Sequence, residues 1–145
     1  MERYRSRISG PLLDRIDVLV EIPPLSHSVL CAGGQAESSW VVRERVVRAR
    51  AFRTARLSEF EAKGEPRPMP AATPWLLEAR NRLEADAKAL MREALLRYDL
   101  GGRGYVRTIE LARTIADLDN RLEVGADDVA EALALRLDYR RIGFG

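Results

Sequence analysis

Apolar residues follow two different spacings along the chain, and the first is a period of two. Between residues 16 and 22 every second residue is a branched apolar one, and two of the residues between them are acidic. This alternation predicts a short β strand over 16–22, which ends at the proline pair that follows. A single strand is not stable by itself, so we expect it to belong to a sheet that the rest of this chain does not supply.

From residue 38 onward the apolar spacing becomes helical. Ser38 or Ser39 can cap a helix that runs to about Lys63, because a serine oxygen accepts a hydrogen bond from an N–H of the first turn. Gly64 and four prolines within the next ten residues exclude regular structure. We therefore expect a proline-rich linker over 64–74.

A second helix is predicted from Pro74 to about Tyr98. Proline suits the first position of a helix, where no N–H is needed, and apolar residues then recur with helical spacing. The pattern allows a break near Asn81, and the glycine pair at 101–102 ends it.

Two more helices complete the predicted bundle. Over 104–118 the apolar residues fall on one half of a helical wheel. The other half carries Arg103, Arg107, Glu110, Arg113, Thr114 and Asp117. The last helix, over 126–138, has Asp127 and Asp128 near its positive N-terminus. The fold class is therefore mainly α, a small helical bundle preceded by the short strand.

Composition excludes several classes of protein. The only histidine, His27, and the only cysteine, Cys31, rule out an internal disulfide, a histidine-based metal site and a catalytic triad, so no metal site is expected. No apolar run is long enough to span a membrane, and the N-terminal residues lack the apolar segment of a signal peptide. We expect a cytoplasmic protein with no membrane partner.

Two arginine-bearing segments carry the strongest signal in the chain. They read RYRSRISGPLLDRIDVLVEIP at residues 3–23 and GRGYVRTIELARTIADL at residues 102–118. Together they resemble the closing third of an AAA+ ATPase of the magnesium-chelatase-like group, and they are most similar to its ComM/YifB competence family. The resemblance implies that residues 1–37 are a remnant of the AAA+ core and that residues 38–145 are its helical lid domain.

The resemblance also shows what this chain lacks. A P-loop requires Gly-x-x-x-x-Gly-Lys-Ser/Thr to wrap backbone N–H groups around phosphates. The chain has two lysines, Lys63 and Lys88, and neither ends such a motif. We therefore expect the C-terminal part of a motor protein, inactive as an ATPase by itself and with no bound cofactor. In the full-length protein the resemblance implies ATP and Mg²⁺.

Arg15 takes the position of the family's arginine finger, in the string LLDRID at residues 12–17. Such a finger reaches the ATP of a neighbouring subunit and stabilises the charge of the transferred phosphate. Arg7, together with Arg5, is a second candidate on the same subunit edge. Spacing by itself favours an exposed pair of Arg15 with a neighbouring aspartate, worth ~0–1 kcal/mol, but the length of the match favours the finger.

Arg103 takes the position of the family's sensor-2 arginine, which opens a lid helix and reaches the phosphates. The family usually has SARAYHR where this chain has GGRGYVR. The glycines at 102 and 104 weaken the helix start by ~1 kcal/mol each. Arg107, Glu110, Arg113 and Asp117 are explained by an i,i+3/i+4 ladder on the helix surface, whereas Arg103 has no acidic partner at helical spacing.

The resemblance implies a hexameric ring that uses ATP to drive DNA branch migration in recombination and natural transformation. The partners would be the missing AAA+ core of the same protein, further copies of it, and DNA. Two alternatives remain open. One is a fragment of a magnesium-chelatase ATPase subunit, and the other is an autonomous helical module for protein interaction or DNA binding.

Six arginines between residues 43 and 56 raise the question of direct DNA contact. On a helical wheel they form two groups, one of which is Arg43, Arg50 and Arg53. A narrow apolar stripe that includes Trp40 and Val47 separates the groups. Arginines beside a buried stripe are common on ordinary helices, so a DNA-binding role of these three is the weaker interpretation.

Overall fold

The computed structural model describes residues 16–20, 22, 24, 27, 36–62, 74–98 and 100–141. Most of these residues are helical, as the sequence predicted. The helices are α4 (Ser39–Ala62), α5 (Pro74–Arg80), α6 (Ala85–Tyr98), α7 (Gly102–Leu118) and α8 (Ala126–Arg141). The linker expected at 64–74 lies outside the described residues except at Pro74, and the domain division after residue 37 stays a prediction.

The helix boundaries follow from local chemistry. Ser38 caps α4, because its Oγ accepts a hydrogen bond from the Val41 N–H at 3.4 Å. The predicted break near Asn81 is confirmed: the Asn81 side chain donates to the Leu77 carbonyl at 2.9 Å, and Arg82 then adopts a positive φ of 52°. After α7, Asn120 has a φ of 56°, and the Arg121 N–H donates to the Ala116 carbonyl at 2.8 Å. This is the hydrogen-bond pattern of a Schellman helix end.

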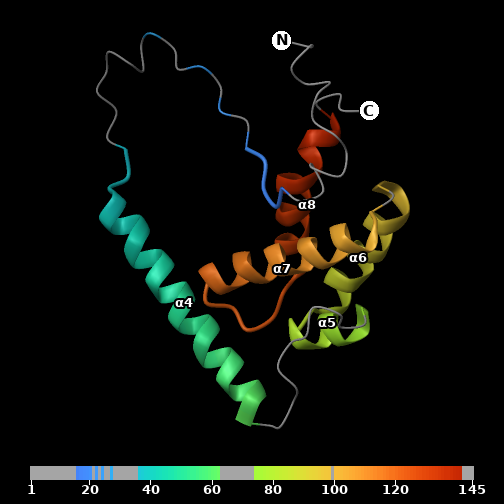
Figure 1. Cartoon of the computed structure of the whole chain (residues 1–145), viewed down its shortest axis with the longest axis horizontal. Coiled ribbons are helices and arrows are strands. Elements are labelled where there is room, and N and C mark those ends of the chain that lie inside the picture. Colours follow the sequence, from blue (N-terminus) through green and yellow to red (C-terminus); the bar gives the residue numbers. More distant parts are fainter. Residues whose placement is uncertain are drawn as a thin grey trace.

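Helix α7 lies at the centre of the bundle (Figure 1). It packs against α8, α4 and α5, and α8 also packs against α6. The connection before α6 pairs with the connection before α8, through Glu84 N–H to the Val124 carbonyl and Val124 N–H to the Arg82 carbonyl, both 3.0 Å. The core is formed by the apolar faces of α6, α7 and α8 together with residues of α5 and the connections. Its largest fully buried apolar side chains are Met91, Ile109, Val124 and Val129.

Helix α4 is the exception to this compact packing. Its C-terminal half contacts α7, while its N-terminal half extends away from the other helices (Figure 1). Trp40 is 66% exposed and Val47 is 55% exposed. The sequence placed both in a buried stripe, and that interpretation is wrong for the described part of the chain, because no other described helix packs on this half of α4.

The strand predicted over 16–22 is not confirmed. Residues 16–20 and 22 belong to no strand ladder in the described part of the chain. Residues 17–19 instead lie beside α8, where the Leu19 N–H donates to the Leu135 carbonyl at 3.0 Å and Arg136 donates to the Asp17 carbonyl at 3.1 Å. A strand needs a neighbouring strand for its backbone groups, and the described residues provide none.

Candidate functional site: an arginine network between α4 and α7

The predicted site residues are distributed over separate parts of the chain. Arg15 and Arg7, the candidates for an arginine finger, lie outside the described residues, as does Arg5. Arg43, Arg50 and Arg53 are exposed on α4. Arg43 lines a hollow beside Trp40, whereas Arg53 lines a different cleft next to α7, so the structure does not bring these three into one site.

Arg103 is the second residue of α7 and is exposed. It makes no ion pair or hydrogen bond with any residue in the described part of the chain. Gly101, at the N-cap position, provides no side-chain acceptor for the first-turn N–H groups. An uncapped helix start carries unsatisfied donors and a partial positive charge, so this end of α7 presents a cation and free N–H groups together.

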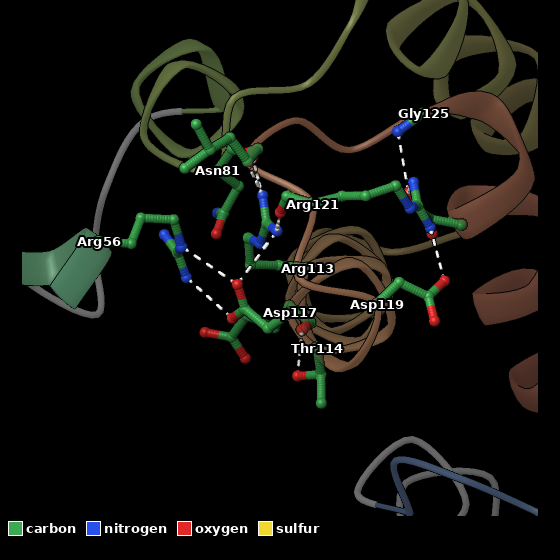
Figure 2. Close-up of polar contacts among 11 residues, drawn as sticks. Arg56, Asn81, Arg113, Thr114, Asp117, Asp119, Arg121 and Gly125 are labelled. Atoms are coloured by element: carbon green, nitrogen blue, oxygen red, sulfur yellow. Dashed lines mark hydrogen bonds and ion pairs between the residues drawn. The ribbon is translucent and has the colours of Figure 1, made fainter. Parts of the chain in front are cut away.

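Three of the buried charged residues in the described part of the chain form a network at the contact of α4 with α7. Arg56, Arg113 and Asp117 are each 4% exposed or less. Arg56 of α4 donates twice to the Asp117 carboxylate, from Nε at 3.2 Å and from Nη2 at 3.0 Å. Arg113 contacts the same carboxylate from the other side, with 3.0 Å between Nη2 and Oδ1 (Figure 2).

Arg113 also holds the loop between α7 and α8. Its guanidinium donates to the Leu122 carbonyl at 2.7 Å and to the Arg121 carbonyl, and it contacts the Asn81 carbonyl at 3.3 Å (Figure 2). Burial lowers the pKa of Arg113, while the charge of Asp117 raises it. One side chain therefore connects α7 to the end of α5 and to the following loop.

A second arginine stabilises the start of α8. Arg121 donates to both oxygens of Asp128, which is 1% exposed, and also to Asp119 at 3.1 Å. These hydrogen bonds raise the pKa of Arg121 further above its ordinary value. Asp128 in turn accepts the Gly125 N–H at 2.9 Å, which satisfies a donor at the helix start (Figure 2). The sequence correctly placed Asp128 in the first turn of α8.

The sequence predicted one of the two ion pairs in the buried network, that of Arg113 with Asp117. It predicted the Arg113–Asp117 pair from i,i+4 spacing but placed it on the surface, and that placement is wrong because α4 covers this face of α7. It treated Arg56 as one of six arginines on a solvated or subunit-facing helix. Arg56 and Asp117 are 61 residues apart, so no local spacing relates them.

Neither a metal site nor a membrane-spanning helix is found among the described residues. Among them, no group of three or more histidine, cysteine, aspartate or glutamate side chains is arranged to hold a metal ion. Within the same residues, each helix is too short or too polar to cross a bilayer.

Comparison with known proteins matches nearly the whole chain. The family model described as magnesium chelatase, subunit ChlI C-terminal, matches residues 36–136. The model described as magnesium chelatase, subunit ChlI, matches residues 1–30. Arg7 and Arg15 lie in the first matched segment along the chain, and Arg103 lies in the second. No solved structure matches the chain.

Individual relatives are similar over the same range. Competence protein ComM of Haemophilus influenzae is 32% identical over 139 residues, which cover 95% of this chain and 26% of the relative. An uncharacterized protein of Mycobacterium tuberculosis is 37% identical over 136 residues, which cover 92% of this chain and 26% of the relative. YifB of Escherichia coli is 32% identical over 143 residues, which cover 92% of this chain and 25% of the relative. The chain thus spans about a quarter of the length of these curated relatives.

Proposed function

Because the chain belongs to the magnesium chelatase ChlI family, we propose that it supplies the arginine finger and the helical lid of an AAA+ ATPase that remodels DNA. In this proposal a P-loop-bearing core holds ATP and Mg²⁺, and the subunits form a hexameric ring. The 145 residues contain no Gly-x-x-x-x-Gly-Lys-Ser/Thr motif, so this chain is not expected to hydrolyse ATP by itself.

The observation that carries the proposal is the position of Arg103. An exposed guanidinium stands at the uncapped N-terminus of α7, where helix N–H groups also favour an anion. The rest of α7 is fixed by the core and by the Arg56–Asp117–Arg113 network, so Arg103 is presented from a rigid helix. This arrangement suits a sensor-2 arginine that reaches nucleotide phosphates when the lid closes.

Arg15 completes the proposal as a finger that acts on a neighbouring subunit's ATP, with Arg7 as the second candidate. An arginine supplied in trans stabilises the charge of the transferred phosphate, and removing such a residue lowers the rate by 10³–10⁵-fold as an order of magnitude. DNA as the substrate is supported by the competence protein among the relatives. Arg43, Arg50 and Arg53 on the exposed face of α4 are the weaker candidates for DNA contact.

The test joins this chain to a core that binds nucleotide. The chain replaces the matching quarter of Haemophilus ComM, and ATP hydrolysis by the hybrid is measured with and without branched DNA. Arg15→Ala should abolish hydrolysis while nucleotide binding survives. Arg97→Ala, an exposed arginine of α6 paired with Glu93, is the matched control and should leave the rate unchanged. Hydrolysis retained by Arg15→Ala would reject the finger assignment.

A second candidate function is the motor subunit of a metal chelatase. It is favoured by the description of both matching family models as magnesium chelatase. In that case branched DNA should not raise the hydrolysis rate of the hybrid, whereas a chelatase partner complex should.

A further inference from the structure

A cleft of about 390 Å³ lies between α4, α5 and α7, next to the buried network. Its walls contain five arginines: Arg53 and Arg56 from α4, Arg80 from α5, and Arg107 and Arg113 from α7. Such a volume is within the range of small-molecule binding sites. Arg103 does not line this cleft, whereas Arg107, one helical turn further along α7, does.

The acidic residues of the cleft are all engaged. Asp117 is shared by Arg56 and Arg113. Glu110 accepts a hydrogen bond from Arg107 at 3.2 Å, and Asp17 lies 3.5 Å from both Arg107 and Arg136. Five positive charges therefore face three negative ones, which leaves two positive charges without a counter-charge in the lining.

The two uncompensated cations are Arg53 and Arg80. Neither forms an ion pair or a hydrogen bond with any residue in the described part of the chain. Arg80 is half-buried, and its pKa is lowered by burial and by the charges of Arg56 and Arg53. The charge of Glu110, which is paired with Arg107, raises this pKa but does not reverse the shift. A half-buried guanidinium beside other guanidinium groups is unfavourable unless an anion joins it.

We propose that this cleft binds a phosphate group, with Arg53 and Arg80 as its direct ligands. A phosphate monoester carries a charge of about −1.5 to −2 at neutral pH, which matches the two unpaired cations. The arginine fork donates two parallel hydrogen bonds to phosphate oxygens, and the buried Arg56 and Arg113 add positive potential behind it. The phosphate comes from a nucleotide or from a DNA backbone, since both present anionic phosphate oxygens, although each backbone diester carries only one negative charge.

This site is independent of the proposed ATPase role and of Arg15 and Arg103. It assigns a function to Arg80, which no sequence motif distinguished. It also gives Arg53 a role in a phosphate pocket, separate from the DNA-facing role that the helical wheel suggested for it.

The test uses the 145-residue chain and sodium pyrophosphate in titration calorimetry at low salt. The wild type should show saturable binding, and the double variant Arg53→Gln/Arg80→Gln should bind at least tenfold more weakly. Arg97→Gln, an exposed arginine outside the cleft, should stay within twofold of the wild type. Absence of saturable binding by the wild type, or an equal loss in both variants, would overturn the site.

Protection from chemical modification tests the site in the wild-type chain, so the result does not depend on how the variant folds. Phenylglyoxal modifies exposed arginines, and mass spectrometry reports each position. Pyrophosphate should protect Arg53 and Arg80 but not Arg97, and equal modification of all three with and without pyrophosphate would contradict the proposal. Competition with ATP and with a short single-stranded DNA then identifies the source. Displacement by ATP assigns a nucleotide, displacement by DNA assigns a backbone phosphate, and displacement by neither overturns the site.

Discussion

The Arg56 guanidinium of α4 and the Asp117 carboxylate of α7 form a buried, two-pronged ion pair with donor–acceptor distances of 3.2 and 3.0 Å. This pair lies where the C-terminal half of α4 meets the bundle. No other described helix packs against the other half of α4. The orientation of α4 therefore depends strongly on the contacts of its C-terminal half, which include the buried Arg56–Asp117 pair and an exposed ion pair of Glu59 with Arg82 at 3.4 Å.

Removing the shared carboxylate should be strongly destabilising. Asp117→Asn leaves Arg56 and Arg113 buried without a counter-charge, and breaking a buried pair in this way costs ~3–5 kcal/mol. Urea denaturation followed by circular dichroism measures the free energy of unfolding. Glu93→Gln removes an exposed partner of Arg97 and should change it by less than ~0.5 kcal/mol. Similar decreases in the free energy of unfolding of both variants would show that the buried Asp117 carboxylate stabilises the fold no more than the exposed Glu93 does.

Arg56→Met should detach α4 from the bundle without unfolding the bundle itself. The methionine keeps part of the apolar stem but cannot bind Asp117. Hydrogen exchange should become faster in the C-terminal half of α4, while α8 keeps its protection. Arg45→Met is the matched control, because its ion pair with Glu37 is exposed, and it should leave the exchange of that half unchanged. Faster exchange throughout α8 would instead indicate global destabilisation.

Burial of Tyr105, together with the hydrogen bond that its hydroxyl donates to Glu78, raises the pKa of the phenol above its ordinary value of 10. A phenol whose pKa is raised on folding retains its proton in the native state while the unfolded chain loses it. Stability therefore falls as the pH rises above 10. Tyr105→Phe should cost ~1.5–3 kcal/mol at pH 7, the range for a hydrogen bond to a charged group.

The free energy of unfolding of Tyr105→Phe should also differ from that of the wild type in its dependence on alkaline pH. Its disadvantage relative to the wild type should shrink between pH 10 and pH 12, because the phenylalanine has no proton to lose. Urea denaturation at a series of pH values measures this difference. A difference that stays constant across the series would contradict the raised pKa of Tyr105.

Gly104→Ala should stabilise the start of α7. An added Cβ would meet the Leu100 side chain at 3.5 Å, which is ordinary van der Waals contact, and alanine favours a helix by ~0.8–1.0 kcal/mol over glycine. Thermal unfolding should show a higher melting temperature. Gly125→Ala is the contrasting variant, because its Cβ would lie 3.3 Å from the Glu84 carboxylate. An equal rise in melting temperature for both variants would show that the close approach to Glu84 does not destabilise Gly125→Ala.

Arg103→Ala in the ComM hybrid should lower the rate of ATP hydrolysis and weaken the dependence of lid closure on nucleotide. Fluorescence energy transfer between the lid and the core, with and without ATP, measures the closure. The change in stability should be small, since Arg103 is exposed at the first turn of α7. An unchanged hydrolysis rate would reject its sensor role while leaving the finger prediction untouched.

Much of the helical architecture was predictable because local chemistry sets it. The serine before α4, the proline at the start of α5, and the glycine pair at the start of α7 mark boundaries that the structure confirms within a few residues. The resemblance to the family was also available from sequence, because the two arginine-bearing segments are contiguous strings. The finger and sensor-2 roles of Arg15, Arg7 and Arg103 remain predictions.

Tertiary packing decided what local patterns do not encode. The sequence determined where each helix begins and ends, which face of α7 is apolar, and that Arg113 and Asp117 are one helical turn apart. Only the folded structure determined that α4 covers their polar face, buries them with Arg56, and brings Arg53 and Arg80 to one cleft. Helical periodicity reports which residues share a face, but the burial of that face depends on which distant segment packs against it.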